Sequence, residues 1–360
     1  MRIGIVGLPN AGKSSLFNAL TRAGASAAGY PFTTVEPNVA VVEVPDERLE
    51  RVAETVGAAP IVHETIAFHD IAGLVRGASR GEGLGNQFLA NIRETDAIVH
   101  AVRAHDDEQV PHPEGRVDPL ADVETVETEL LLADLEQAER RLERVARQAK
   151  SHEAAAMAEE AWLRELIAAL SEGRPARTVP PPEEAPEALR SLAPLTANPV
   201  LYVANVREEG PFEAPPELVE RARDAGAGLL AVSARLEAEL AELDAPEAEA
   251  MRAELGAPES GLARLIRAAF ELLDLISFLT AGEGKEARAH AVDRGTTAWE
   301  AAGKIHTDIQ RGFVRAEVVA WDKLVAAGSY AAARERASLR LEGRDYVMRD
   351  GDVMTVRFTP

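Results

Sequence analysis

The segment that most constrains the fold is Gly7-Leu8-Pro9-Asn10-Ala11-Gly12-Lys13-Ser14. It has the spacing Gly-x-x-x-x-Gly-Lys-Ser of a phosphate-binding loop. The apolar residues 3–6 before it are typical of a buried parallel strand, and residues 15–20 after it have helical spacing. A glycine-rich turn with a stray lysine would not need these flanks. The segment therefore predicts an α/β domain that holds a nucleotide phosphate where a helix begins.

Each residue type in this loop has a chemical reason. Glycine lets the backbone N–H groups curl around a β-phosphate, and the positive end of the helix faces the same anion. Lys13 is expected to reach the β- and γ-phosphates, and the Ser14 hydroxyl is expected to ligate Mg²⁺.

Two later segments are candidates for the γ-phosphate side of the same site. Asp70 follows a predicted strand at 65–69 and opens the pattern Asp-x-x-Gly, in which the carboxylate holds Mg²⁺ through water and the Gly73 N–H approaches the γ-phosphate. Thr34 lies between the first helix and a predicted strand at 39–44, where switch proteins carry a threonine that completes the Mg²⁺ coordination. Two adjacent threonines, here Thr33 and Thr34, are also common in loops that only form a turn.

The residue that would orient the attacking water is missing from its usual place. Leu74 stands where Ras-like enzymes carry a glutamine, and leucine cannot orient a water. The glycine-rich residues 77–85 behind it indicate a switch segment. One other source of the missing group is His112, in the loop that follows a predicted strand at 97–102. A histidine in a proline-rich loop is more often simply solvated.

Residues 121–170 are rich in Ala, Glu, Leu and Arg, and their apolar positions recur in alternating steps of four and three. We interpret residues 122–195 as an antiparallel helical hairpin inserted into a nucleotide-binding domain that spans residues 1–275. The hairpin is either a spacer or a docking arm.

The α/β pattern then resumes with two predicted strands, at 200–204 and 228–232, whose ends carry polar residues. The first strand leads into Asn205-Val206-Arg207-Glu208 and the second into Ser233-Ala234-Arg235. Switch GTPases carry Asn-Lys-x-Asp and Ser-Ala-Lys at the corresponding places and read the base there. This spacing disfavours a metabolite kinase.

Glu208 stands where a guanine-reading protein has aspartate. The extra methylene displaces the carboxylate by about a bond length, which is enough to spoil a bidentate contact to guanine. We therefore expect ATP to be preferred over GTP, although a shift of the loop could bring Glu208 back into register.

Residues 276–360 alternate strand-like runs with one helix-like stretch, which predicts a small α+β module. The strand-like runs are at 275–279, 287–292, 313–319, 346–348 and 353–358, and the helix-like stretch is at 298–309.

The formal net charge of −21 argues against a protein that coats DNA or an anionic membrane by charge alone. Residues 276–360 hold 13 Lys and Arg against 12 Asp and Glu, so an anionic partner is expected to meet this part. No apolar run has membrane-spanning length, and the first predicted strand starts at Arg2. We therefore expect a cytoplasmic protein. The absence of cysteine excludes disulfides and thiolate metal sites.

With these residues laid out, the chain resembles the YchF family of Obg-like ATPases along nearly its whole length. The resemblance is carried by residues 7–14, 30–38, 70–86, 205–208, 301–308 and 350–353. It implies a Ras-like P-loop domain with a helical insertion, followed at 276–360 by a TGS domain, a ubiquitin-like β-grasp module. It also implies slow hydrolysis of ATP rather than GTP, and association with ribosomes.

The resemblance further assigns roles to single residues. Ser14 and Thr34 would be the Mg²⁺ ligands, Val206 would lie against the base, and His112 would position the water. Asn10 stands where cation-dependent relatives hold K⁺, whose charge replaces an arginine finger. The phosphate cradle would be formed by Asn10, Ala11, Gly12, Lys13, Ser14 and Ser15, and the base contacts by Asn205, Val206, Glu208, Ser233 and Ala234. Departures from the family pattern are Ala11 for valine, Arg76 and Arg80 for lysines, and Arg235 in the third base-contact segment.

The sequence thus predicts a Mg²⁺-dependent NTPase, with ATP as its preferred nucleotide, that changes conformation with its γ-phosphate and acts at the ribosome. Two alternatives remain open from the residues. One is a nucleotide-gated module that binds RNA or protein and hydrolyses nucleotide only incidentally, and the other is a GTPase.

Overall fold

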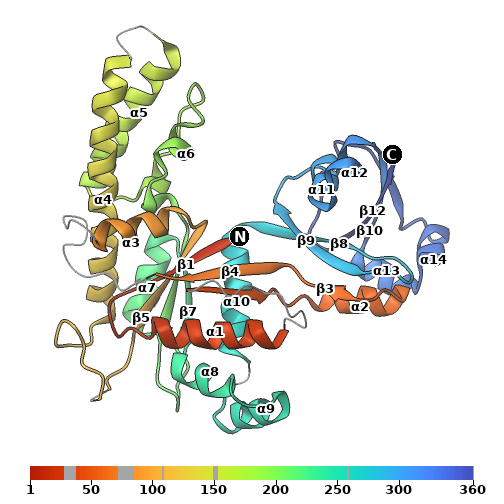
Figure 1. Cartoon of the computed structure of the whole chain (residues 1–360), viewed down its shortest axis with the longest axis horizontal. Coiled ribbons are helices and arrows are strands. Elements are labelled where there is room, and N and C mark those ends of the chain that lie inside the picture. Colours follow the sequence, from red (N-terminus) through yellow and green to blue (C-terminus); the bar gives the residue numbers. More distant parts are fainter. Residues whose placement is uncertain (28–37, 72–83, 108, 149–152, 258, 360) are drawn as a thin grey trace. The chain divides into compact units, whose positions relative to one another are not determined.

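The computed structural model describes residues 1–27, 38–71, 84–107, 109–148, 153–257 and 259–359 (Figure 1). The chain folds into two compact units. The first consists of Met1–Val42 and Ala67–Leu272, and the second of Glu43–Ile66 and Leu273–Pro360. The chain therefore enters the second unit twice.

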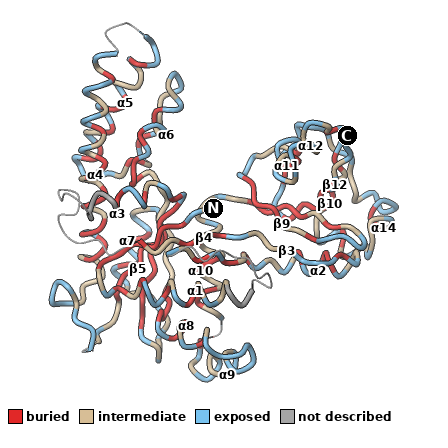
Figure 2. Tube along the Cα trace, in the orientation of Figure 1, coloured by how far each residue is buried: buried red, intermediate tan, exposed pale blue. Residues whose placement is uncertain are grey.

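The described part of the first unit is built on a sheet of six strands in the order β2-β4-β1-β5-β6-β7. The strands are β1 (Arg2–Val6), β2 (Val39–Glu43), β4 (Thr65–Asp70), β5 (Ala97–Arg103), β6 (Val200–Asn205) and β7 (Gly228–Val232). The pairs β4–β1, β1–β5, β5–β6 and β6–β7 are parallel. All seven residues of β5 are buried, as expected for a strand covered on both faces (Figure 2). The carboxyl ends of these parallel strands therefore meet at one edge, where ligands of such sheets bind.

The described helices of this unit outside its helical insertion pack on this sheet or on one another (Figure 1). They are α1 (Lys13–Ala27), α3 (Leu84–Arg93), α7 (Pro216–Ala225), α8 (Ala234–Leu240), α9 (Ala245–Glu254) and α10 (Gly261–Leu272). One hydrophobic cluster joins Leu8 of the phosphate loop and Ile71 after β4 to α3, to β5 and to the long helix α4 (Pro119–Gln148). The phosphate loop thus rests on the same core as the segment that follows Asp70.

The predicted helical insertion is formed by α4 (Pro119–Gln148) and α5 (Ala154–Ser171), which pack along each other. It returns through a short helix α6 (Ala188–Leu192) and the 3₁₀ turns η3 (Ala176–Thr178) and η4 (Leu195–Ala197). Its own core includes Trp162, whose indole N–H donates to the Val179 carbonyl at 3.1 Å. The buried Asp134 accepts from the N–H groups of Leu195 and Thr196 at 2.7 and 2.8 Å, and so ties the end of the insertion to α4.

The second unit has a mixed sheet with the strand order β11-β10-β12-β8-β9-β3. Its strands are β3 (Ile61–Val62), β8 (Leu275–Thr280), β9 (Ala287–Asp293), β10 (Phe313–Ala320), β11 (Arg340–Glu342) and β12 (Asp352–Phe358). Its helices are α2 (Glu47–Val56), α11 (Ala298–Ile305), α12 (Thr307–Arg311), α13 (Trp321–Ala327) and α14 (Tyr330–Glu335). Strands β8 and β12 pair in parallel, whereas β8–β9 and β10–β12 are antiparallel, in agreement with a β-grasp arrangement.

The expected fold class is confirmed: a P-loop α/β domain with a helical insertion, and a smaller α+β module. Some elements differ from the prediction. The stretch 298–309 divides into α11 and α12 at His306, whose backbone is extended and whose ring nitrogen accepts from the Asp308 N–H at 3.1 Å. Residues 346–348 form only an isolated bridge from Val347 to Thr297 instead of a strand. Helices α13 and α14 and strand β11 were not predicted.

The domain division also differs from the expected one. The sequence prediction assigned all of residues 1–275 to the nucleotide-binding domain, but Glu43–Ile66 belong to the second unit. The physical reason is packing, because Leu49, Val52 and Ala53 of α2 share a hydrophobic core with Leu279 and Val353 of the C-terminal strands. Nothing in the local pattern of α2 shows which core its apolar face will join.

None of the helices in the described ranges combines the length and the apolar character needed to cross a membrane.

Candidate functional site

The loop between β1 and α1 has the backbone conformation that its glycines predict. Gly7 and Gly12 have φ angles of 149° and 94°, and Asn10 has a φ of 65°. A Cβ on Gly7 would collide with the Ala101 carbonyl, and one on Gly12 would collide with the Asn205 side chain. Glycine is therefore required at both positions for two reasons: neighbouring atoms leave no space for a Cβ, and the φ angles disfavour other residues. The loop delivers the chain into α1, whose first N–H groups lack acceptors within the helix and can bind an anion.

Lys13 and Asp70 lie close enough to influence each other electrostatically. Lys13 is buried, and its ammonium donates to the Leu8 carbonyl at 2.8 Å, inside the curl of the loop. Burial lowers the pKa of Lys13 to about 8, and the nearby Asp70 carboxylate opposes that shift. Burial also raises the pKa of Asp70, against the effect of Lys13. Asp70 reaches this position because β4 pairs with β1, with Asp70 opposite Ile5.

A single buried side chain, Asn205, connects the phosphate loop with the predicted base-contact turn. Its amide nitrogen donates to the Ala11 carbonyl at 3.1 Å, and its amide oxygen accepts from the Ala234 N–H at 3.0 Å. Ser233 caps α8 through a hydrogen bond from the Leu236 N–H at 3.3 Å. The ends of β1, β6 and β7 are thereby held in one arrangement.

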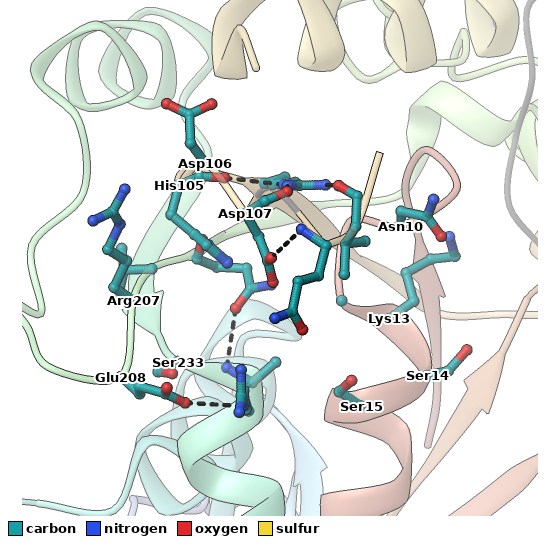
Figure 3. A pocket seen from close by; sticks show the side chains of 18 of the residues that line it. Asn10, Lys13, Ser14, Ser15, His105, Asp106, Asp107, Arg207, Glu208 and Ser233 are labelled. Carbon is teal, nitrogen blue, oxygen red and sulfur yellow. Dashed lines mark hydrogen bonds and ion pairs between the residues drawn. The ribbon is translucent and has the colours of Figure 1, made fainter. Parts of the chain in front are cut away.

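These segments enclose a cavity of about 760 Å³ at the carboxyl ends of the strands (Figure 3). Ten of the predicted site residues line it: Asn10, Gly12, Lys13, Ser14, Ser15, Asn205, Val206, Glu208, Ser233 and Ala234. Ala11 contributes its carbonyl to Asn205 instead. Thr34 and Gly73 lie outside the described residues, as does Leu74. The cavity has the size and the location of a ligand site in an α/β protein.

Glu208 lines the cavity, but its carboxylate is paired with a neighbour. Its Oε2 lies 3.0 Å from Nε of Arg235, which itself donates to Glu239 at 3.3 Å. Figure 3 marks the ion pair at Glu208 with a dashed line. The sequence prediction included Glu208 as a base contact and named Arg235 only as a departure from the family pattern, without this ion pair.

Sequence reasoning missed most of the wall formed by the loop after β5. Arg103 is buried at the end of this strand and donates to three carbonyls of that loop: those of His105 at 3.0 Å, Val110 at 2.7 Å and Asp107 at 3.2 Å. The loop's residues Arg103, His105, Asp106, Asp107, Gln109 and Val110 line the cavity. The available signal was an arginine at the end of a strand that is apolar apart from His100.

His112 is not among the residues that line this cavity. Its Nε2 lies 2.9 Å from Oδ2 of Asp122 on α4, and its Nδ1 accepts from the Glu114 N–H at 3.2 Å. Since Nδ1 is an acceptor, Nε2 carries the proton and donates to Asp122. The side chains of His112 and Asp122 are only 4% and 6% exposed. The neighbouring Pro111 carbonyl accepts from the Asn10 amide at 2.9 Å, so the loop itself touches the phosphate loop.

The site geometry defines the class: a P-loop protein with a nucleoside-triphosphate cavity. Two family models match the chain. One, described as "50S ribosome-binding GTPase", covers residues 2–148, and the YchF-type C-terminal model, described as "Protein of unknown function (DUF933)", covers residues 275–359.

Curated relatives extend the match to the whole chain. The chain is 48% identical over 360 residues to the "Ribosome-binding ATPase YchF" of Bacillus subtilis, covering 99% of this chain and 98% of the relative. It is 48% identical to the protein of the same name from Haemophilus influenzae, with 99% of each chain covered. The solved structure of the Schizosaccharomyces pombe YchF GTPase matches with a TM-score of 0.88 and 35% identity, covering 99% of this chain and 97% of that one. The chain belongs to the YchF family.

Proposed function

We propose that this protein is a Mg²⁺-dependent ATPase that associates with the ribosome and changes conformation with the state of its nucleotide. The observation that carries the proposal is the single cavity in which the phosphate loop and the base-contact turn meet, joined by Asn205. The curated relatives named ribosome-binding ATPases support the same function.

At the phosphate end, the backbone of residues 10–15 would cradle the β-phosphate. Lys13 would exchange its hydrogen bond to Leu8 for the β- and γ-phosphates, and the Gly73 N–H would approach the γ-phosphate. A charged phosphate is a stronger acceptor than a carbonyl, so this exchange favours binding.

The residues present fit a magnesium ion. The Ser14 hydroxyl and the Asp70 carboxylate are oxygen donors of the type that Mg²⁺ prefers, and Asp70 is a half-buried carboxylate whose pKa is raised by burial. Thr34 is the proposed third group. When bound, the ion would offset charge on the β- and γ-phosphates. For K⁺, the proposed ligand is the Asn10 side-chain oxygen, because the Asn10 nitrogen is engaged by Pro111.

At the base end, we propose that adenine lies against the buried Val206 and reads Asn205 and the backbone around Ala234. Glu208 is one methylene longer than the aspartate of guanine readers, and its carboxylate already faces Arg235. Both features favour ATP over GTP. The names of the relatives and of the family model differ on this point, since both ATPase and GTPase occur among them.

For hydrolysis, we propose that His112 positions the attacking water. Its hydrogen bond to Asp122 holds it away from the cavity, so the side chain must leave Asp122 before it can act. Catalytic contacts are often incomplete without ligand and form only when substrate is bound.

We assign ribosome contact, through ribosomal RNA or protein, to the second unit. That unit carries 15 Lys and Arg against 19 Asp and Glu, whereas the first carries 24 against 41. The second unit is therefore the less acidic of the two. Its positive and negative charges are not as nearly equal as those of residues 276–360 alone, because Glu43–Ile66 add more acidic than basic residues. We propose a cytoplasmic location, without DNA or membrane as a partner.

The nucleotide test is a titration of the full chain with ATP and GTP at the same Mg²⁺ and K⁺ concentrations. We expect ATP to bind more tightly, and tighter binding of GTP would make the protein a GTPase. Turnover with and without ribosomes separates an ATPase from a nucleotide-gated binding module. Stimulated turnover supports the ATPase, whereas tight nucleotide-dependent co-sedimentation without stimulation supports the binding module.

The ribosome test uses substitutions in the full chain, because a break at residue 275 would leave Glu43–Ile66 without their core. Arg311→Glu in the second unit should weaken co-sedimentation with ribosomes. Arg223→Glu in the first unit is the matched control, since both arginines are exposed and lie beside an aspartate. Equal loss in both variants would contradict the assignment to the second unit.

A further inference from the structure

We infer that Arg235 is a specificity-determining residue, which holds the Glu208 carboxylate in an ion pair and so withdraws it from guanine. This inference rests on the proposed function, because it assumes that a purine occupies the base end of the cavity.

Glu208 is the acidic residue at the place from which a carboxylate would read guanine. Its Oε2 is inaccessible to solvent and accepts no hydrogen bond from the described residues. The nearest cationic group is Nε of Arg235, at 3.0 Å. This oxygen is therefore held in the cavity wall by charge attraction to Arg235, without a directional hydrogen bond.

Arg235 reaches Glu208 because it lies in the turn after β7, the same turn that is proposed to contact the base. It follows Ala234, whose N–H is bound to Asn205, and it lies in the first turn of α8. Glu208 is the main cause that raises the pKa of Arg235, followed by Glu239, one turn further along the helix. Arg235 thus has two carboxylates within ion-pair distance, and of these two only Glu208 lines the cavity. Asp107, which also lines the cavity, acts on Arg235 more weakly and from a greater distance.

Guanine and adenine present different groups to a carboxylate at this place. Guanine presents two donors there, N1–H and the 2-amino group, and both can bind a free carboxylate. Adenine presents the lone pair of N1 and a C–H group, so a free carboxylate opposite it is unfavourable. Pairing Glu208 with Arg235 therefore disfavours guanine and removes a repulsion from adenine, and specificity is the difference between the two affinities.

The size of the effect is limited by exposure. The Arg235 side chain is 69% exposed, and ion pairs of such groups are weak because water screens them. Replacing Arg235 should therefore shift the ratio of GTP to ATP affinity by about two- to fivefold, and should not reverse a large preference.

The test compares dissociation constants for ATP, GTP and ITP in the full chain with Mg²⁺. Arg235→Met should tighten GTP binding and leave ATP binding equal or weaker. ITP lacks the 2-amino group, so it should gain less than GTP if the freed carboxylate makes a bidentate contact. Adding Glu208→Gln to Arg235→Met should abolish the gain, and Arg235→Lys, which keeps a cation, should preserve the original ratio.

Glu239→Gln is the matched control, because it removes the other partner of Arg235 and leaves the pair with Glu208 in place. It should leave the GTP to ATP ratio unchanged. An unchanged ratio in Arg235→Met, or a gain that persists when Glu208→Gln is added, would overturn the role of Arg235. Tighter binding of GTP than ATP by the unsubstituted protein would instead overturn the proposed ATP preference, so the two failures are distinguishable.

Discussion

The phosphate loop and the loop after β5 border the same cavity, but different means hold them in shape. The phosphate loop depends on backbone geometry, because Gly7 and Gly12 occupy conformations and spaces that no side chain fits. The loop after β5 depends on side chains: Arg103 gathers its carbonyls, and Asp122 holds His112. The first device fixes a binding site before the ligand arrives. The loop after β5 can be rearranged by breaking a few hydrogen bonds. This suits hydrolysis, the step that follows nucleotide binding.

The largest expected effect tests the phosphate side of this comparison. Lys13→Ala should weaken ATP binding by about 10²–10⁴-fold, because charge-assisted hydrogen bonds to two phosphates are lost. Titration with ATP measures this effect, and a thermal unfolding curve checks that the variant is folded. Wild-type affinity in a folded variant would contradict the assignment of the phosphate site.

The complementary test is His112→Ala in the loop after β5. We expect ATP to bind normally and turnover to fall roughly ten- to a thousandfold, as for loss of a group that orients water without touching phosphate. Single-turnover hydrolysis, measured together with a binding titration, separates the effect on hydrolysis from the effect on ATP binding. If affinity and turnover fall together, the two loops do not divide binding from hydrolysis as we propose.

A pH titration sharpens the phosphate side further. Since burial lowers the pKa of Lys13 to about 8 in the free protein, the ammonium is charged below that pH and loses its proton above it. Phosphate binding requires the charged form, so ATP affinity should be nearly constant just below pH 8 and fall by about tenfold per pH unit above it. Isothermal titration at several pH values measures this. Lys13→Ala should show no such dependence, and a flat profile in the unsubstituted protein would contradict the lowered pKa of Lys13.

The same contrast explains how much could be predicted from the sequence. The phosphate loop, the positions of the parallel strands along the chain and the helical insertion follow from local signals: glycine spacing, apolar runs and helical periodicity. The order of the strands in the sheet was not predicted and comes from the structure. Asn205 was predicted as a base contact, but its bridge from Ala11 to Ala234 depends on strands that are distant in sequence. The orientation of His112, the role of Arg103 and the membership of α2 in the second unit depend on tertiary packing, which no local pattern encodes.

The smallest expected effect concerns the contact that holds His112 away from the cavity. Asp122→Asn keeps the shape of the side chain but replaces a charge-assisted acceptor with a neutral one, which is roughly half as strong. The position of the His112 side chain against residue 122 should then be less favoured. Turnover should therefore rise by about two- to fivefold, with little change in KM. Steady-state kinetics with saturating ATP measures the change.

The control for that experiment is Asp118→Asn, at a partly exposed aspartate on the same loop that accepts from the Ala121 N–H at 3.1 Å. It alters the charge near the start of α4 without touching His112, so turnover should stay unchanged. The direction of the Asp122→Asn effect decides between two roles. A rise means that Asp122 keeps His112 out of the reaction until nucleotide binds. A fall means that Asp122 orients His112 during hydrolysis, and then the loop after β5 would be as fixed as the phosphate loop, and the difference between them would disappear.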